Sequence, residues 1–359
     1  MPVPSSGPVA ISDLVDEFGG TAPHSLSEYY RGGSFVPGNN TNVPTAGAFG
    51  LSNARGAVNE IAIAATSGAN IDISSLFGAN WTSTVPKRLT IGSGVTIGGT
   101  GSSAALIIPA NMAGTLEIDN AGSIIGKGGA ANGGAGGHAI SNSASGVTIN
   151  NTGLLAGGGG GGGLGGVGGN GSYTSTSTVY AGTCNAAGAS IIFWDTYGFG
   201  VCGGQRYTLT WSAYGYNTYN MGGTPPRTFG GATWAIYETC YTNSEAGDGC
   251  FINGYRASRT ASSTVSTTGG SGGSGGVGQG YTQTNASGAS GASGGTNAGT
   301  GGTGGAGATY GNAGATGSNG ANGNASNGSA GSAGGAAGAA VIGTSVSMNN
   351  TGTLYGAVA

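Results

Sequence analysis

Ionisable side chains are scarce in this sequence. Asp, Glu, Lys and Arg make up only 6% of the 359 residues, the formal net charge is −3, and none of these four residue types occurs after Arg259. A nucleic-acid-binding surface needs a basic patch to neutralise phosphates, so the composition excludes that class of function. An ordinary protein surface rich in Lys and Glu cannot be built from this composition either.

Long apolar runs are also absent. No stretch approaches the roughly 20 apolar residues that a membrane span needs, which argues against insertion into a membrane. The N-terminus has neither the basic region nor the apolar run of a secretory signal. The sequence therefore predicts synthesis in the cytoplasm without a signal peptide.

Residues that could carry catalysis or bind metal are few. The chain has two histidines, His24 and His138, and four cysteines without CxxC spacing, so we expect no metal site and no Ser–His–Asp set. Residues 122–127 superficially resemble a phosphate loop, but they have one residue too few between the glycines. Glu117 and Asp119 lie on one predicted strand face, where such acids are usually solvated. The sequence predicts no enzyme and no cofactor.

Glycine is what the sequence has in abundance, with 84 residues. Within 267–338 it recurs at every third position, as at Gly311, Gly314 and Gly317. This period matches neither an α-helix nor a β-strand, but it matches the left-handed extended helix of three residues per turn, which has no internal hydrogen bonds. The last proline is Pro226, so a collagen-like structure would lack its stiffening residue. A disordered linker is the other alternative.

We predict that residues 127–146, 157–172 and 267–345 form parallel and antiparallel polyglycine-II helices in one bundle. Glycine on two faces lets neighbouring backbones approach closely enough for N–H and C=O groups to bond between helices. Reversals of direction are expected where the glycine period lapses, at 281–285, 308–312 and 324–327.

A strand-turn-strand pattern occurs three times, at 116–126, 147–157 and 346–356. Each copy reads apolar-x-apolar-Asp/Asn-Asn-x-Gly-x-apolar-x-Gly, with Asn and Gly able to take left-handed dihedrals in the turn. Such units bury their apolar edges by stacking on one another, as in a solenoid. The third copy follows an excursion from 158 to 345, so the chain must leave the stack and return to it.

Two short helices are expected in an N-terminal docking segment, residues 1–36. Ser12 is the predicted N-cap of the first helix, and Ser25 with Glu28 forms a capping box for the second. Helices this short need a partner surface or the following domain for stability. A local cap on that following domain is an equally good interpretation of the segment.

Residues 37–110 contain short runs in which apolar residues alternate, such as 61–64, 71–73 and 87–91. Alternation of this kind is typical of β-strands. We therefore predict a β-rich domain here.

Residues 173–266 interrupt the glycine tracts with a different composition. They hold most of the aromatic residues and all four cysteines, Cys184, Cys202, Cys240 and Cys250. We expect a small inserted β domain with two disulfides, for which Cys184–Cys202 and Cys240–Cys250 is the simplest of three pairings. Buried free thiols are the alternative.

The predicted fold is thus mostly β with irregular structure. A short β-solenoid-like repeat stack with polyglycine-II arms occupies 111–172 and 267–359, and the aromatic-rich β domain occupies 173–266. Little α-helix is expected, confined to the N-terminus. Because outgoing and returning arms flank the insert, we expect it at the end of the arms farthest from the stack.

The chain begins with Ser5-Ser6-Gly7-Pro8 and continues to Ser25-Leu26-Ser27-Glu28-Tyr29-Tyr30, and its Asn-Asn-x-Gly unit at 149–153 runs into polyglycine at 157–163. Both features resemble glycine-rich bacteriophage virion proteins, especially tail-fibre tips and receptor-binding adhesins. The resemblance implies a polyglycine-II scaffold whose exposed loops contact bacterial surface receptors. Residues 173–266 have no counterpart in it.

Two functions fit these features. In the first, the scaffold presents the aromatic insert or the arm loops to a host glycan or an outer-membrane protein, because Tyr and Trp give rigid contact area and stack on sugar faces. In the second, a purely structural tail or capsid-decoration protein buries the same aromatics in its core and subunit contacts. An ice-binding or surface-coat protein is a third alternative. The residues predicted to contact a receptor are Trp194, Tyr197, Tyr214, Tyr216, Tyr219 and Trp234.

The resemblance also implies where the protein works and with what. We expect it in the virion, joined to other virion tail proteins through the N-terminal segment. Its second partner would be the host receptor, and the sequence leaves homo-oligomerisation open.

Overall fold

A computed structural model describes all of the chain except parts of the insert. The backbone is described for residues 2–181, 193–198, 210–211, 216–217, 219–220, 227–229, 232–244 and 250–359, and the side chains for 2–178 and 259–359. The chain divides into two compact units, Met1–Gly171 with Thr267–Ala359, and Ser172–Ser266. The prediction of a mostly β protein with little helix is confirmed, since the described residues form parallel sheets and only two short α-helices.

The first residues of the chain form a small module with its own apolar core. It contains α1 (Ile11–Phe18) and two 3-10 turns, η1 (Leu26–Tyr29) and η2 (Leu51–Ala54). The core continues well past the predicted end of this segment at residue 36. Its buried members are Val3, Leu14, Phe18, Tyr29, Val36, Val43, Ala54 and Ala57.

The start of α1 differs from the prediction. Ala10, not Ser12, is the N-cap, because the Asp13 carboxylate accepts a hydrogen bond from the Ala10 amide at 2.8 Å. The capping box predicted for the second turn is confirmed: the Ser25 amide donates to the Glu28 carboxylate at 3.1 Å. An acid at the third helical position can thus anchor a helix start that lacks a capping hydroxyl.

Three parallel sheets form a strand stack, in which each of the first four turns of the chain adds one strand to each sheet and the fifth turn adds a strand to two of them. The first sheet has the order β1 (Ile61–Ala64), β4 (Lys87–Ile91), β7 (Leu116–Asn120), β10 (Val147–Asn151) and β21 (Ser347–Asn350). The second has the order β2 (Gly68–Ala69), β5 (Thr96–Gly98), β8 (Ser123–Ile125), β11 (Leu154–Ala156) and β22 (Thr353–Tyr355). The third consists of β3 (Ile71–Asp72), β6 (Leu106–Ile108), β9 (Ile140–Asn142) and β20 (Val341–Gly343).

The three sequence repeats lie in register on successive turns of this stack. Leu116 pairs with Val147, and Ile149 pairs with Met348. Two earlier turns belong to the same sheets, although their strands fall in the segment that the sequence suggested as a separate β-rich domain. The first sheet therefore crosses the proposed boundary at 110/111 without interruption.

The interior of the stack is filled by aliphatic side chains. Along β7 and β10 buried residues alternate with half-buried ones, as expected when one face of a strand packs inward. Each fully buried aliphatic side chain contributes roughly 1.5–3 kcal/mol relative to exposure. Among the residues with almost no exposure are Leu89, Ile91, Ile97, Leu106, Ile108, Leu116 and Ile118.

Helix is not confined to the N-terminus, contrary to the prediction. α2 (Ile73–Phe77) and the 3-10 turn η3 (Gly78–Thr82) follow β3, so the strand expected over 71–73 ends at Asp72. The Asp72 carboxylate accepts a hydrogen bond from the Ser74 amide at 2.9 Å and caps the helix. The cap stops the alternation and lets the apolar residues that follow turn into the core.

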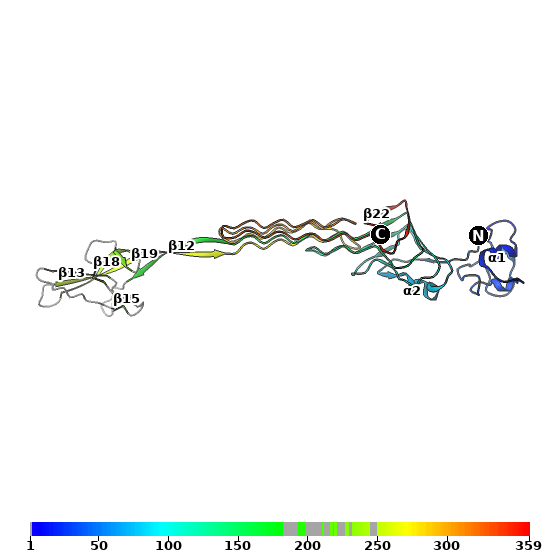
Figure 1. The fold of residues 1–359 in the computed structure, drawn as a ribbon, viewed down its shortest axis with the longest axis horizontal. Coiled ribbons are helices and arrows are strands. Elements are labelled where there is room, and N and C mark those ends of the chain that lie inside the picture. Colours follow the sequence, from blue (N-terminus) through cyan, green and yellow to red (C-terminus); the bar gives the residue numbers. More distant parts are fainter. Residues whose placement is uncertain are drawn as a thin grey trace. The chain divides into compact units, whose positions relative to one another are not determined.

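Glycine-rich tracts fill the connection from β8 to β9 and, outside the insert, the long excursion from β11 to β20. They contain no helix, and apart from an isolated bridge at a turn they contain no strand pairing. Figure 1 shows these tracts running side by side. Turns interrupt them at 131–133, 281–282, 296–297, 310–311 and 324–326.

Backbone hydrogen bonds between the tracts recur at every third residue. Gly162, Gly165 and Gly168 donate to Gly276, Gly273 and Gly270 of an antiparallel tract at 2.8–2.9 Å. Gly163, Gly166 and Gly169 donate to Ala315, Ser318 and Ala321 of a parallel tract at 2.8–2.9 Å. The tracts are thus held by main-chain pairing between neighbours, with no bonds along each tract.

The tract 157–171 is the central one, and its sequence follows its surroundings. Its all-glycine part is also covered by the short hairpin within 126–139, where the Gly133 amide donates to the Gly162 carbonyl at 2.8 Å. Beyond the tip of that hairpin one face of the tract is open. Leu164 and Val167 occupy that face and are 40% and 50% exposed. The unbroken run of glycines therefore ends where the hairpin no longer covers the tract.

The second unit is a β structure in its described parts. Its main sheet has the order β16 (Tyr219–Asn220), β13 (Phe193–Gly198), β19 (Cys250–Thr267), β18 (Ala232–Ser244) and β17 (Arg227–Phe229), with β12 (Gly171–Ala181) also paired to β19. β14 (Thr210–Trp211) and β15 (Tyr216–Asn217) form a separate pair.

Candidate functional site

The aromatic residues predicted to contact a receptor lie mostly on strands of the second unit. Trp194 and Tyr197 are on β13, Tyr216 is on β15, Tyr219 is on β16 and Trp234 is on β18. Tyr214 lies outside the described residues.

The backbone brings some of these residues together. β13 and β16 are parallel neighbours in which Phe193 registers with Tyr219, so Trp194 and Tyr219 lie one residue apart along adjacent strands. Trp234 registers with Arg227 at the opposite edge of the same sheet. Two of the predicted contact residues therefore gather at one sheet edge, and Trp234 does not join them.

The predicted disulfides fall where side chains are not described. Cys240 lies on β18 and Cys250 begins β19, while Cys184 and Cys202 are outside the described residues. The pairing of the four cysteines stays a prediction.

A charged cluster lies on the outer face of the first sheet of the stack. Arg88 on β4 binds three carboxylates: its Nε lies 3.0 Å from Glu60, and its two terminal nitrogens lie 2.7 Å from Glu117 and 2.6 Å from Asp119. Hydrogen bonds to Glu60 and Asp119 raise the pKa of the Arg88 guanidinium. One guanidinium among three carboxylates leaves an excess of negative charge on this face.

The pKa of Asp119 reflects opposing effects. Partial burial alone would raise the pKa of this carboxyl, but hydrogen bonds from Asn150 and Arg88 outweigh burial and hold it below its usual value. Asp119 is therefore ionised in the folded protein at neutral pH, and its charge is part of the outer face.

Asparagine side chains run across the stack in two ladders and explain the Asp/Asn-Asn pair of the repeat. In the inner ladder Asn120 donates to Asn151 at 2.7 Å, and Asn151 donates to Asn350 at 2.6 Å. In the outer ladder Asn150 donates to Asp119 at 2.8 Å, and Asn349 donates to Asn150 at 2.9 Å. Each ladder fixes the register of neighbouring turns.

The inner ladder begins abruptly at Asn120. Its register partner on β4 is Ile91, which offers no hydrogen bond, and the side-chain oxygen of Asn120 is buried without a partner. The repeat was therefore not evident in the earlier turns of the stack, because Ile91 stands where the repeat has its marking asparagine.

A buried lysine begins β4 of the first sheet. Lys87 is 1% exposed, and its Nζ donates to the carbonyls of Ser83, Val85 and Ala113 at 2.7–3.1 Å. Desolvation lowers the pKa of this amine. The lysine satisfies carbonyls of two loops, the one between η3 and β4 and the one before β7. Sequence analysis could not show this role, because Lys87 opens an ordinary alternating strand.

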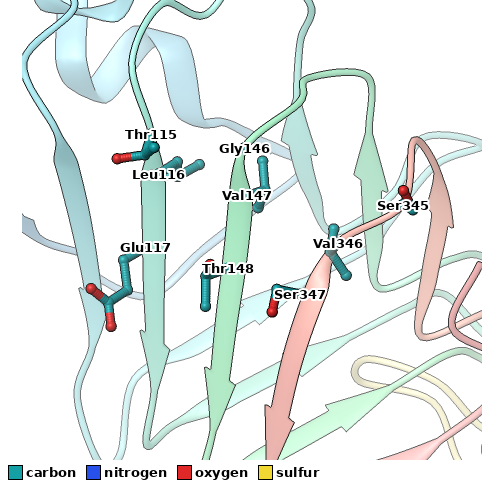
Figure 2. A pocket seen from close by; sticks show the side chains of 9 residues that line it. All are labelled: Thr115, Leu116, Glu117, Gly146, Val147, Thr148, Ser345, Val346 and Ser347. Carbon is teal, nitrogen blue, oxygen red and sulfur yellow. The ribbon is translucent and has the colours of Figure 1, made fainter.

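A groove of about 570 Å³ crosses the starts of β7, β10 and β21. Figure 2 shows Glu117, Thr148 and Ser347 on three neighbouring strands at this surface. No motif marks small hydroxyl residues on strands, so sequence analysis missed the groove. Its lining residues are Thr115, Leu116, Glu117, Gly146, Val147, Thr148, Ser345, Val346 and Ser347.

The described residues hold no group of three or more His, Cys, Asp or Glu placed to bind a metal ion. No helix in the described part of the chain is long and apolar enough to cross a membrane.

Comparison with known proteins first identifies the class of protein to which the chain belongs. The family model of the phage tail fibre adhesin Gp38 matches residues 59–257, which is more than half of the chain. The chain belongs to this family of phage tail fibre adhesins, and the resemblance to such adhesins in the sequence is confirmed. The family is one of virion-associated adhesins and not of enzymes. The match begins beside β1 and extends through the central glycine tract into the insert.

Among solved structures, the chain is similar to the crystal structure of the gp37-gp38 adhesin tip complex of the bacteriophage S16 long tail fibre. The two are 18% identical with a TM-score of 0.37, and the match covers 99% of this chain and 100% of that chain. No curated protein matches the chain by sequence.

Proposed function

We propose that this adhesin recognises the host bacterial surface through residues 173–266, held on a scaffold of polyglycine-II helices. The family match carries the proposal, because it identifies a tail fibre adhesin and extends into the insert. Phe193 and Tyr219 register on adjacent strands and therefore share a face of the sheet, which supports an aromatic contact surface there. The partner would be a surface glycan or an outer-membrane protein, since rigid aromatic rings suit both.

The proposed scaffold has two parts. Main-chain bonds at every third residue, without bonds along each tract, support polyglycine-II helices for the glycine tracts. One strand per sheet in each turn supports a short β-solenoid for the stack. Both are rigid elements, and a rigid base lowers the entropy cost of presenting a binding surface.

The junctions of the insert make a clean deletion possible. The chain leaves the first unit at Gly171 and re-enters it at Thr267, and a Cβ on Gly171 would lie 2.6 Å from the Thr267 hydroxyl. A short Gly-Ser linker can therefore replace residues 172–266 without stretching the bundle.

Binding of the labelled full chain and of this deletion variant to host cells tests the proposal. We expect the full chain to bind saturably and the deletion variant to lose binding, while the thermal unfolding of the deletion variant still shows a folded first unit.

A triple variant, Trp194→Ala, Tyr197→Ala and Tyr219→Ala, should bind host cells with an affinity lower by at least about tenfold, because aromatic contacts commonly dominate binding energy. Tyr355→Ala, in the stack, is the matched control and should bind normally. Undiminished binding by the deletion variant would contradict the proposal and favour a structural virion role or a site on the arms.

Treatment of the cells separates the two receptor classes. Periodate oxidises the vicinal diols of glycans, and protease treatment removes exposed parts of outer-membrane proteins. Loss of binding after periodate alone would assign a glycan, and loss after protease alone would assign a protein.

We further propose that the N-terminal module attaches the adhesin to another tail protein. Its core of residues 3–57 is separate from the core of the stack, so it can serve as an independent docking element. A chain that starts at residue 59 should bind host cells but fail to join phage particles. Incorporation of this truncated chain into particles at the normal level would contradict an attachment role.

A further inference from the structure

The last turn of the strand stack has three edge strands, and two of them are covered. Beyond β20, the Val341 amide donates to the Ala357 carbonyl and the Ala359 amide donates to the Val341 carbonyl, at 3.1 and 3.2 Å. Beside β22, Tyr310 packs against Tyr355 with ring centroids 6.0 Å apart. The chain's own end thus pairs with β20, and one turn of the bundle packs against β22.

The third edge strand, β21, has no such cover in the described part of the chain. It pairs with β10 on one side only, and Ser347, Asn349 and Asn350 are exposed. In a parallel ladder alternate residues direct both backbone groups to the same side. Since the Thr351 amide donates to Asn151 on β10, Met348 directs its N–H and C=O to the open side.

This edge lacks the features that normally prevent strand addition. Natural edge strands are blunted by Lys, Pro or a bulge, because unpaired N–H and C=O groups form a template for another strand. β21 has the sequence Ser-Met-Asn-Asn and pairs with β10 in unbroken register. It is therefore a ready template for an added strand.

Both asparagine ladders end at β21 with unused capacity. Within the ladder Asn151 donates to Asn350 at 2.6 Å, but the Asn350 amide itself reaches only the Gly352 carbonyl at 3.4 Å. In the outer ladder Asn349 donates to Asn150, and its own oxygen accepts no hydrogen bond from the described residues. A further strand with Asn or Asp opposite Asn350 and Asn opposite Asn349 would continue both ladders.

The neighbouring groove leaves room for such a strand's side chains. Ser345 and Ser347 line it at the β21 edge, and Glu117 lines its other side. Figure 2 shows these small side chains beside the start of β21.

We propose that β21 is a docking edge for an extended segment of another protein. The segment adds in parallel as a further strand of the first sheet and carries Asn opposite Asn349 and Asn or Asp opposite Asn350. This interaction is with a polypeptide and does not depend on how the insert recognises the host.

A peptide with the sequence of residues 147–157, VTINNTGLLAG, is the probe, because it contains the strand that already pairs with β21 in the chain. Residue-resolved amide hydrogen exchange of the full chain is measured with this peptide at about 1 mM, a concentration that detects weak binding. We expect exchange at Met348 to slow about tenfold, because the added strand bonds that amide. A peptide in which both asparagines are replaced by serine should give clearly less protection.

Two variants make the test specific. Ser347→Lys with Asn349→Lys places charge on the exposed face of the edge and should abolish protection at Met348, whereas Thr90→Lys on β4, on the same face but away from the edge, should keep it. Absence of protection in the unmodified chain, or equal protection in the double variant, would overturn the proposal. A concentration-dependent dimer in sedimentation that the double variant loses would also overturn it, because the occupant would then be a second copy.

Discussion

The strand stack and the glycine bundle belong to one compact unit, yet different atoms hold each of them. In the stack, aliphatic side chains such as Ile118 and Ile149 fill the interior, and backbone bonds join neighbouring strands within each sheet. In the bundle, neighbouring backbones touch directly, and carbonyl oxygens lie where a side chain would begin. The stack therefore needs large apolar side chains at its buried positions, whereas the bundle needs residues that have no side chain.

This difference governs tolerance to substitution. A core of side chains can be repacked when the total volume is kept, at a cost usually below about 1.5 kcal/mol. A core of backbone atoms has no equivalent exchange. At Gly160 an added Cβ would lie 2.0 Å from the Gly335 carbonyl oxygen, so even alanine cannot be accommodated without separating two tracts.

The largest expected effect is therefore in the bundle. Gly160→Val should lower the free energy of unfolding by more than about 4 kcal/mol or prevent folding, because overpacking of this kind belongs to the severe end of single substitutions. Gly273→Val and Gly317→Val should behave similarly, since a Cβ there would lie 2.0 and 2.2 Å from carbonyl oxygens. Denaturant unfolding measures the change.

Leu164→Ala is the control in the same tract. Its side chain is 40% exposed on the open face, so its loss should cost less than about 1 kcal/mol. If Gly160→Val and Leu164→Ala were equally mild, close backbone contact would not be what holds the bundle together.

The next effect lies in the stack. Ile149→Ala removes a fully buried side chain and should cost about 2–5 kcal/mol, while Ile149→Leu should cost less than about 1.5 kcal/mol. Thr148→Ala, on the outer face of the same strand, should be nearly neutral. Thermal unfolding of the three variants measures these differences. A leucine variant as unstable as the alanine variant would mean that shape, and not volume, dominates this core.

Much of the structure of these two regions could be predicted from the sequence, but not equally well for both. The period of three indicated main-chain pairing, and turns occur close to the expected reversals at 281–285, 308–312 and 324–327. The turn at 296–297 was missed because Gly294 and Gly295 precede it, so the sequence shows no clear interruption of the glycine period there. The early turns of the stack were missed because Ile91 replaces the marking asparagine.

The binding surfaces were less accessible to sequence reasoning. Aromatic enrichment pointed to 173–266, and the backbone places Trp194 near Tyr219, but strand pairing over a long connection cannot be deduced from composition. The open edge at β21 was invisible because it depends on which strands lack a neighbour. The repeat showed that Asn349 and Asn350 belong to the stack, and only the topology showed that no strand of the described residues pairs beyond them.

A smaller effect is expected from the ladders that join the turns of the stack. Asn151→Ala removes one of the two acceptors of the buried Asn120 amide, the other being the Leu154 carbonyl, and should cost about 1–3 kcal/mol. Asn349→Ala removes an exposed member of the outer ladder and should cost less than about 1 kcal/mol. Chemical denaturation of both variants compares the inner ladder with the outer one, and equal losses would show that burial does not strengthen the inner bonds.

The smallest expected effect comes from the charged cluster on the outer face. Arg88, Glu117 and Asp119 are about one-third exposed and Glu60 is 21% exposed, so solvent screens the ion pairs, and Arg88→Met should cost about 1 kcal/mol at neutral pH. The folded protein holds the pKa of Asp119 below its usual value, so this carboxylate contributes stability above that usual value, and the contribution is lost as pH falls through the lowered pKa. Because Arg88 is one cause of the lowered pKa, the difference in unfolding free energy between the unmodified chain and Arg88→Met should narrow below about pH 4.

Unfolding free energies measured from pH 7 to pH 3 test this, with Thr90→Ala on the same strand as the control. A gap that stays constant or widens in acid would show that Arg88 acts through packing of its aliphatic stem, which would make the outer face a side-chain-packed surface like the interior of the stack.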